Sequence, residues 1–132
     1  EKKKLVRDAD YLCNAGVFSI VIEAVAENAA NDVIKKVKNY KKRFVPTIGI
    51  GASKHCNGQI LVTDDMIGLT NKYKGNKLPK FVKVFKNYDL ELSVRKFCDE
   101  VRNGLFPSNE FCYTKNKKVF NNVTYLKFSE KK

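Results

Sequence analysis

The sequence contains no long apolar run. Its longest run, from residue 15 to residue 22, suffices for one strand, whereas a membrane-spanning helix requires roughly 20 apolar residues. The amino end, Glu1-Lys2-Lys3-Lys4, lacks the apolar segment of a secretory signal. We therefore expect no membrane segment and a cytoplasmic protein, or a mitochondrial one in a eukaryote. Because the chain begins with Glu1, we expect that it was cut from a longer protein.

Histidine is scarce and the cysteines are not grouped. The chain has 1 histidine and 4 cysteines, without CxxC or HxxxH spacing, so no local pair of ligands begins a zinc site. Most of the cysteines lie in or beside apolar stretches, where a thiol behaves as a small apolar side chain. We expect reduced thiols in an intracellular protein at Cys13, Cys56, Cys98 and Cys112.

Acidic residues are outnumbered by basic ones. Lys and Arg total 26 against 14 Asp and Glu, which gives a formal net charge of +12. The basic residues are spread along the chain, and no RNA- or DNA-binding motif accompanies them. We therefore expect a solvated, lysine-rich surface and no nucleic-acid partner. Weak, salt-sensitive binding to polyanions is left open as an alternative.

What the chain does have is an alternation of helical and strand-like segments. Apolar spacing predicts helices over 5–13 and 26–37, and apolar, mostly β-branched runs predict strands over 17–22, 45–51 and 59–63. The first strand is apolar on both faces, which predicts that both faces are covered, as in parallel sheets. Strands that alternate with helices indicate an α/β fold with a parallel sheet.

The second half is predicted to be mostly helical. Pro79 is placed to begin one helix, with Leu78, Phe81, Val82 and Phe85 on one face. Asp89 is placed to cap a longer helix that ends at Asn103-Gly104. Beyond it, residues 113–132 form a tail rich in Lys and Asn.

Three parallel strands cannot close a sheet on themselves. The two outer strands would leave unpaired apolar edges, whereas an eight-stranded barrel of alternating strands and helices takes roughly 250 residues. A chain of 132 residues supplies about half of such a barrel. We therefore expect the remaining strands to come from elsewhere.

The first candidate for chemistry is Glu23. It follows a predicted buried parallel strand, and in an α/β barrel the carboxyl ends of the strands form the active-site rim. A carboxylate flanked by Ile22 and Ala24 would be partly desolvated, which suits a general base. The alternative is a solvated acid that favours the dipole of the following helix. Both interpretations are left open by the spacing.

Gly49 and Gly51 are the second candidate. Glycines at a strand end let backbone amides approach a bound substrate, or they simply allow a tight turn. The GxG pattern lacks the third glycine and the following helix of a dinucleotide fingerprint. We favour the turn and keep substrate binding by these two residues as a hypothesis.

The remaining polar candidates are weaker. Asp64 and Asp65 are oxygen ligands of the kind that hard cations take, but adjacent residues of an extended segment point to opposite sides. We expect one of them to cap the next loop or helix. His55 has no catalytic partner that the sequence identifies, so we expect a surface residue.

Several linked blocks make the chain similar to ketopantoate hydroxymethyltransferases. The resemblance extends in order over about residues 5–111 and matches only the carboxyl-terminal half of that family. It is carried by NAGVFSIVIE at 14–23, VPTIGIGA at 45–52, HCNGQILV at 55–62, DMIGL at 65–69 and PKFVK at 79–83.

The resemblance implies a fold and a reaction. Residues 1–112 would be the carboxyl-terminal half of a (β/α)8 TIM barrel of the phosphoenolpyruvate mutase-like superfamily, and 113–132 a basic tail. The family transfers a hydroxymethyl group from 5,10-methylenetetrahydrofolate to 3-methyl-2-oxobutanoate and gives 2-dehydropantoate, in pantothenate biosynthesis. The resemblance implies that Glu23 is the catalytic acid/base, that Mg²⁺ stabilises the enolate, and that the protein is a homo-oligomer assembled through the barrel helices.

The chain also departs from the family. The residues that bind Mg²⁺ in the family and its substrate lysine belong to the amino-terminal half, upstream of this chain, so we expect no metal ligand here. Asn57 stands where the family usually has Asp, and Ser53 where it usually has Gly. The missing half and the basic tail leave a second hypothesis open, an inactive fragment that acts as a binding or assembly module.

Overall fold

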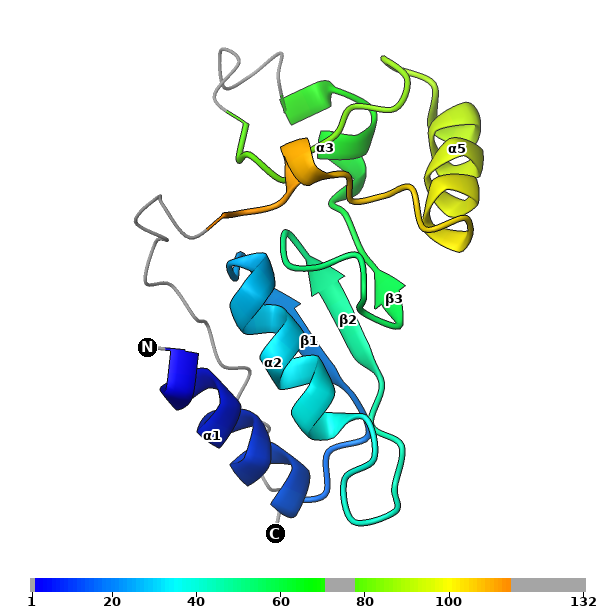
Figure 1. The fold of residues 1–132 in the computed structure, drawn as a ribbon. Helices are drawn as coiled ribbons and strands as arrows, with labels where there is room; N and C mark the ends of the chain where they lie inside the picture. Colours follow the sequence, from blue (N-terminus) through cyan, green and yellow to red (C-terminus); the bar gives the residue numbers. More distant parts are fainter. Residues whose placement is uncertain (1, 71–77, 115–132) are drawn as a thin grey trace, which may run out of the picture.

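The computed structural model describes residues 2–70 and 78–114. Its three-stranded parallel sheet has the order β1-β2-β3, and the helices lie on one side of the sheet and beyond its end (Figure 1). No helix in these two ranges is long and apolar enough to span a bilayer. The elements are α1 (Lys2–Asn14), β1 (Ile20–Glu23), α2 (Glu27–Val37), β2 (Thr47–Ile50), β3 (Gly58–Gln59), α3 (Thr63–Met66), α5 (Leu90–Arg102) and the 3₁₀ helix η1 (Asn109–Phe111).

The register of β1 and β2 decides which side chains share a face. Ile20 pairs with Thr47 and Glu23 pairs with Ile50. Because side chains alternate between the two faces of a strand, Ile20 and Ile22 lie on one face of β1, and Val21 and Glu23 lie on the other. The exposure follows this alternation, since Ile20 and Ile22 are buried while Val21 and Glu23 are exposed.

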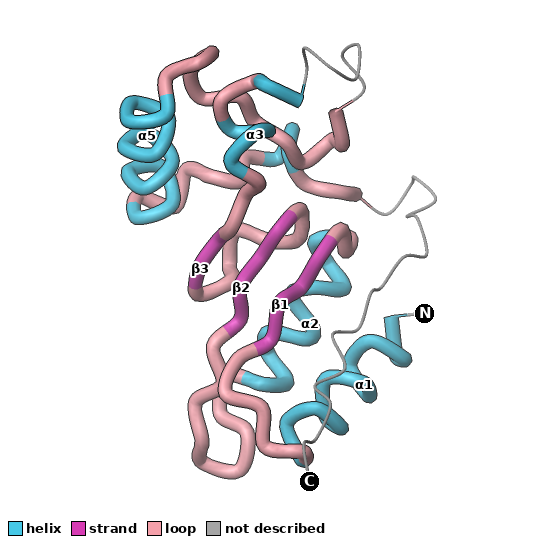
Figure 2. Tube along the Cα trace, turned by 180° about the vertical axis from the view of Figure 1, so that it is seen from behind, coloured by secondary structure: helices cyan, strands magenta, loops and turns pink. Residues whose placement is uncertain are grey.

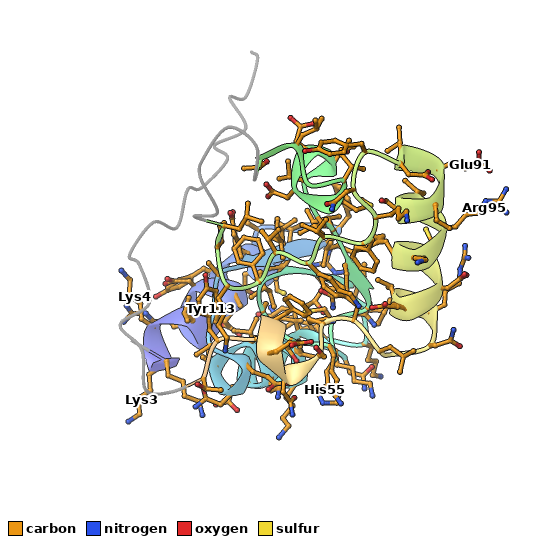
Figure 3. All side chains as sticks on the ribbon, turned by 90° about the horizontal axis from the view of Figure 1, so that it is seen from above. Lys3, Lys4, His55, Glu91, Arg95 and Tyr113 are labelled. Atoms are coloured by element: carbon orange, nitrogen blue, oxygen red, sulfur yellow. The ribbon has the colours of Figure 1, made fainter. Side chains whose placement is uncertain are left out.

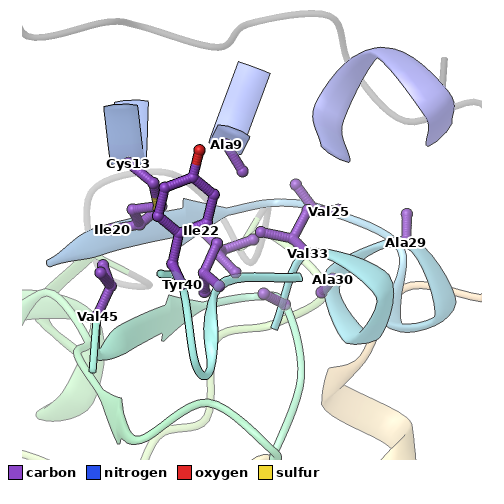
Figure 4. Close-up of a cluster of buried hydrophobic side chains, with 12 residues drawn as sticks. Ala9, Cys13, Ile20, Ile22, Val25, Ala29, Ala30, Val33, Tyr40 and Val45 are labelled. Carbon is purple, nitrogen blue, oxygen red and sulfur yellow. The ribbon is translucent and has the colours of Figure 1, made fainter. Parts of the chain in front are cut away.

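Helices α1 and α2 cover the face that carries Ile20 and Ile22 (Figure 4). The small side chains of Ala29 and Ala30 let α2 approach the sheet closely, and Val33 completes its apolar stripe. The packing confirms the helices predicted over 5–13 and 26–37. The buried residues of this cluster are Ala9, Cys13, Ile20, Ile22, Val25, Ala29, Ala30, Val33, Val37, Tyr40, Val45 and Ala52.

The opposite face of β1 is bare, so the prediction of two covered faces is wrong for the described residues. Val21 is 56% exposed, and Glu23, on the same face, is exposed as well. Figure 2 shows the sheet from this side, with α2 behind it. A parallel sheet with helices on one face only is the arrangement of a barrel wall, in which the helices form the outer ring. This confirms the α/β fold class predicted from the sequence.

The third strand is shorter than predicted. Only Gly58 and Gln59 pair with β2, although the Ile60 amide still donates to the Gly49 carbonyl at 2.9 Å. The prediction of a strand over 59–63 is wrong at its end, because α3 begins at Thr63. Residues 60–62 lead directly from the sheet into that helix.

The helix predicted to begin at Pro79 is also wrong. Residues 78–89 form turns and irregular segments. The Phe85 amide donates to the Met66 carbonyl at the end of α3, and the Tyr88 amide donates to the carbonyl of the next residue, Ile67, each at 2.9 Å. The helix does not form because Phe81 and Phe85 pack in different clusters rather than on one helix face. Phe81 packs with Ile50 at the sheet, whereas Phe85 packs against rings near α5.

Helix α5 confirms its predicted start and end. The Leu92 amide donates to Oδ1 of the N-cap Asp89 at 2.9 Å, and the helix stops before Asn103 and Gly104, of which Gly104 has φ +67°. Within α5, Oε1 of Glu100 lies 2.6 Å from Nζ of Lys83 in the preceding segment. Four aromatic rings join α5 to the preceding and following segments: Phe85, Phe97, Phe106 and Phe111.

A strained turn joins α2 to β2. Lys41 and Lys42 have φ of 49° and 66°, and the Arg43 amide donates to the Tyr40 carbonyl at 2.8 Å. Positive φ at both central residues defines a type I′ turn, for which Asn-Gly is the preferred pair. Two lysines therefore occupy backbone conformations that L side chains disfavour.

We expect replacement of Lys41-Lys42 by Asn-Gly to raise the free energy of unfolding by about 1 kcal/mol, because the new pair adopts positive φ with less strain. Urea denaturation measures the change. Lys35→Gly, at a helical position of α2, is the control and should lower the free energy of unfolding by up to about 1 kcal/mol. A turn variant no more stable than the natural protein would show that the turn is unstrained.

A second prediction concerns the pairing of α1 with α2. Oδ1 of Asp10 lies 2.9 Å from Nζ of Lys36, and the hydrogen bond from Lys36 lowers the pKa of Asp10 below its ordinary value. A lowered folded-state pKa contributes stability above the ordinary aspartate pKa of about 3.9, and this contribution is lost as the pH falls. We expect Asp10→Asn to weaken the fall of Tm between about pH 6 and about pH 3. Equal falls for variant and natural protein would contradict it.

Candidate active site

The carboxyl ends of β1 and β2 lie side by side and form the rim of the sheet (Figure 1). Glu23 is the last residue of β1 and pairs with Ile50, the last residue of β2. Its side chain is on the bare face and is exposed. The expected partial desolvation is therefore absent in the described chain, because no described element covers that face of β1. The position itself, a carboxylate at the carboxyl end of a parallel strand, is the predicted one.

The residue after Glu23 has an unusual backbone. Ala24 has φ 50°, and its amide donates to the Ile50 carbonyl at 2.9 Å. A residue other than glycine in the left-handed region costs on the order of 1–3 kcal/mol, and such residues gather at functional sites. The chain thus turns away from the sheet immediately after the candidate base, while the turning residue stays tied to β2.

Gly49 and Gly51 are surrounded by protein side chains. A Cβ on Gly49 would lie 2.6 Å from Oε1 of Gln59, and a Cβ on Gly51 would lie 2.5 Å from Cδ1 of Phe81. Gly51 also has φ +64°, which L side chains rarely adopt. The geometry supports the turn and close-packing interpretation of the GxG pattern, and substrate binding by the two glycines remains a prediction.

Phe81 closes the rim above β2. It is buried with Ile50 and Val82, and Ala24 packs against the same cluster. The ring of Tyr113 meets the ring of Phe81 edge-on, with centroids 6.2 Å apart. We call this set the rim cluster; its members are Ala24, Ile50, Leu61, Leu78, Phe81, Val82 and Tyr113.

Tyr113 connects the rim cluster to α2. The Glu27 amide at the start of α2 donates to the Tyr113 carbonyl at 3.0 Å, and Nζ of Lys80 donates to the Cys112 carbonyl. The sequence assigned Tyr113 to the basic tail, of which residues 115–132 lie outside the described part. Burial raises the pKa of the Tyr113 hydroxyl, which stays protonated.

The two departures from the family pattern have clear hydrogen-bond roles. Ser53 is fully buried, and its hydroxyl donates to Oδ1 of Asn31 at 2.6 Å. Oδ1 of Asn57 accepts from the Thr47 amide at 2.9 Å and from the Thr47 hydroxyl at 3.2 Å. Because both bonds to Asn57 need only an acceptor, an amide oxygen serves where the family uses a carboxylate.

The other sequence candidates lie apart from Glu23. Asp64 and Asp65 belong to the first turn of α3, where Asp64 is exposed and Asp65 is buried. The residue before α3 is Val62, and no side chain caps the helix, so the expectation is wrong for this helix, and a cap on the following loop stays a prediction. His55 is exposed, as predicted, and is labelled in the view from above (Figure 3).

The described cysteines are free, and the acids form no metal cluster. Burial raises the pKa of the thiols of Cys13, Cys56 and Cys112, which keeps them protonated and poorly nucleophilic. Within residues 2–70 and 78–114, no group of three or more His, Cys, Asp or Glu side chains could hold a metal ion. The described rim therefore offers a single candidate base beside a packed apolar cluster.

Three residues of the rim were not predictable as functional residues from the sequence. An alanine in the sequence does not indicate a positive φ, so the backbone conformation of Ala24 could not be predicted. Phe81 was assigned to the face of a helix that does not form. Tyr113 follows the buried Cys112, and this apolar pair was the one available sign that the fold continues past residue 112.

The chain is similar to known proteins over most of its length. A family model described as "Ketopantoate hydroxymethyltransferase" matches residues 1–109. The chain is 45% identical over 115 residues to the 3-methyl-2-oxobutanoate hydroxymethyltransferase of Pelagibacter ubique, an alignment that covers 86% of this chain and 40% of the relative.

Two further relatives have the same name. The protein of Thermosipho africanus is 43% identical over 83% of this chain and 38% of its own length. The protein of Syntrophomonas wolfei is 38% identical over 92% of this chain and 41% of its own length. The chain thus spans about 40% of the length of the curated relatives that it matches.

We expect Gly51→Ala to destabilise the protein by about 2 kcal/mol more than Gly16→Ala. Both glycines have positive φ, but a Cβ on Gly16 would meet nothing within 4 Å, whereas one on Gly51 would overlap the Phe81 ring. Gly16→Ala therefore reports the backbone strain alone. Urea denaturation of both variants checks the difference, and equal losses would mean that Phe81 moves aside freely.

Proposed function

Since this chain belongs to the ketopantoate hydroxymethyltransferase family, we propose that the protein that carries it transfers a hydroxymethyl group to 3-methyl-2-oxobutanoate and forms 2-dehydropantoate. The one-carbon donor in this proposal is 5,10-methylenetetrahydrofolate. The described residues supply the carboxyl-terminal part of a barrel, with the face of β1 that the helices leave bare toward the barrel interior.

The observation that carries the proposal is the place of Glu23. It lies at the carboxyl end of β1, on the face that the helices leave bare. In barrel enzymes the carboxyl ends of the strands surround the substrate. Its carboxylate therefore faces the space in which a substrate would lie once the other strands of the barrel are present.

In the proposed reaction Glu23 acts as general acid/base. The carboxylate takes the proton from the carbon next to the ketone of 3-methyl-2-oxobutanoate, and the electron pair of the broken C–H bond forms the enolate. The enolate carbon then bonds to the methylene carbon of the folate, and both C–N bonds of that carbon break in the course of the transfer. Water supplies the hydroxyl group of the product, and tetrahydrofolate leaves with the proton returned by Glu23 and the remaining proton of the water. General base catalysis of this kind contributes roughly 10²- to 10⁴-fold to the rate.

The Mg²⁺ that the family resemblance implies does not fit the described residues. No group of three acids, histidines or cysteines is assembled among them, and Asp64 and Asp65 belong to α3 rather than to the rim of β1. We propose that any metal ligands lie outside the described part of this chain.

We also propose that the protein assembles with further copies through its helices. Helix α5 leaves an apolar stripe exposed, in which Leu90 is 51% exposed and Val94 is 40% exposed, and Leu105 beyond its end is 62% exposed. Apolar side chains that lie together on a helix surface favour contact with a partner. This support is independent of the chemistry at Glu23.

We expect Glu23→Gln to lower kcat at least about 10²-fold, because glutamine keeps the shape of the side chain but cannot accept the proton. The measurement is hydroxymethyl transfer by the longest natural protein that carries this chain. Glu91→Gln is the control, since Glu91 is an exposed acid that pairs with Arg95 on α5 (Figure 3). We expect that variant to keep full activity.

Two outcomes would contradict the proposal. Turnover that survives in Glu23→Gln would remove this residue from the mechanism. A natural protein without hydroxymethyl transfer, assayed with donor, acceptor and Mg²⁺, would favour the alternative of an inactive binding or assembly module.

A further inference from the structure

We propose that Ala24 is a positioning residue for Glu23: its left-handed backbone, held by the rim cluster, sets the direction in which the Glu23 carboxylate points. This inference rests on the proposed function, because it matters only if Glu23 moves protons. It adds a residue that neither the sequence motifs nor the family resemblance singled out.

The segment after Glu23 is fixed at both ends. On one side the Ala24 amide donates to the Ile50 carbonyl at 2.9 Å, and on the other the Glu27 amide donates to the Tyr113 carbonyl at 3.0 Å. Only residues 24–26 lie between β1 and α2. A connection so short must reverse the chain within one or two residues, and the positive φ of Ala24 makes that reversal.

Packing holds Ala24 in this conformation. Its side chain contacts the cluster formed by Ile50, Phe81 and Val82. Phe81 lies directly against Gly51, where a Cβ would come within 2.5 Å of its ring, and its other neighbour is the Tyr113 ring. Phe81 therefore joins the end of β2 to Tyr113, and through the Tyr113 carbonyl to the start of α2.

A comparison of alanine with glycine at position 24 distinguishes a positioning role from a role in stability. Glycine would adopt φ 50° without strain, as Gly51 does on the neighbouring strand at φ +64°. Alanine restricts the backbone to a narrow left-handed well, and its methyl group supplies the contact with the rim cluster. A strained alanine thus lies next to the candidate base at a position where glycine would fit without strain, and we infer that a fixed direction matters more there than low strain.

The experiment is Ala24→Gly in the longest natural protein that carries this chain. We expect kcat to fall about 10-fold with KM within about 2-fold, because a loosely held base loses alignment with the reacting carbon. We expect Tm to stay within about 3 °C, since the relieved strain offsets the greater freedom of the unfolded chain. Ala24→Ser, which keeps a Cβ, should retain turnover within about 3-fold.

Lys42→Gly is the matched control, because it relieves backbone strain at a position distant from Glu23. Lys42 also has positive φ, 66°, in the turn that precedes β2 at the opposite end of the sheet (Figure 1). Lys42→Gly should leave both kcat and KM unchanged. A loss of turnover in this variant equal to that in Ala24→Gly would show that relaxed turns affect activity in general, and it would overturn the positioning role.

A double variant tests whether Ala24 acts through Glu23. If it does, Ala24→Gly should cost nothing further in a protein that already carries Glu23→Gln. Equal and independent losses would overturn the inference, as would full kcat in Ala24→Gly or a fall of Tm that accounts for the lost activity. These outcomes are distinct from failure of the proposed function, which is shown by a natural protein without hydroxymethyl transfer, and from failure of the role of Glu23, which is shown by an active Glu23→Gln variant.

Discussion

The pairing of β1 with β2 is the constraint on which the rest of the structure depends. With Ile20 opposite Thr47, Ile20 and Ile22 face α2, and Val21 and Glu23 face away from it. A slip by one residue would exchange the two faces, bury the carboxylate under α2 and expose the isoleucines. The same apolar contacts that hold α2 on the sheet therefore place Glu23 on the bare face of β1, where we propose that the chemistry occurs.

The rim of the sheet shows how a short connection is made rigid. Ala24 and Gly51 follow the ends of two neighbouring strands, and both have positive φ. Phe81 fills the space that a side chain on Gly51 would need, and Tyr113 reaches back to the start of α2. The segments of Ala24, Gly51, Phe81 and Tyr113 are distant in the sequence, and they meet at the carboxyl ends of the strands.

The sequence predicted the elements that local patterns control. Helix α5 begins at the expected Asp89 cap, because the cap and the helix are a few residues apart. The predicted helix at Pro79 fails, because Phe81 and Phe85 are drawn to different clusters. The rim position of Glu23 was predictable from strand order. Its exposure depends instead on what covers the face of β1 that lies opposite the helices.

The sequence by itself determined the alternation of helices and strands and the residues of the rim that can carry charge, since apolar periodicity and strand ends are local properties. Only the tertiary structure decided that Ala24 is left-handed, that Gly51 lies under Phe81 and that Tyr113 is part of the fold. These features arise from contacts between residues that are tens of positions apart, such as the bond from Glu27 to Tyr113. No local pattern encodes such contacts, because they exist only once the strands have paired and the helices have packed.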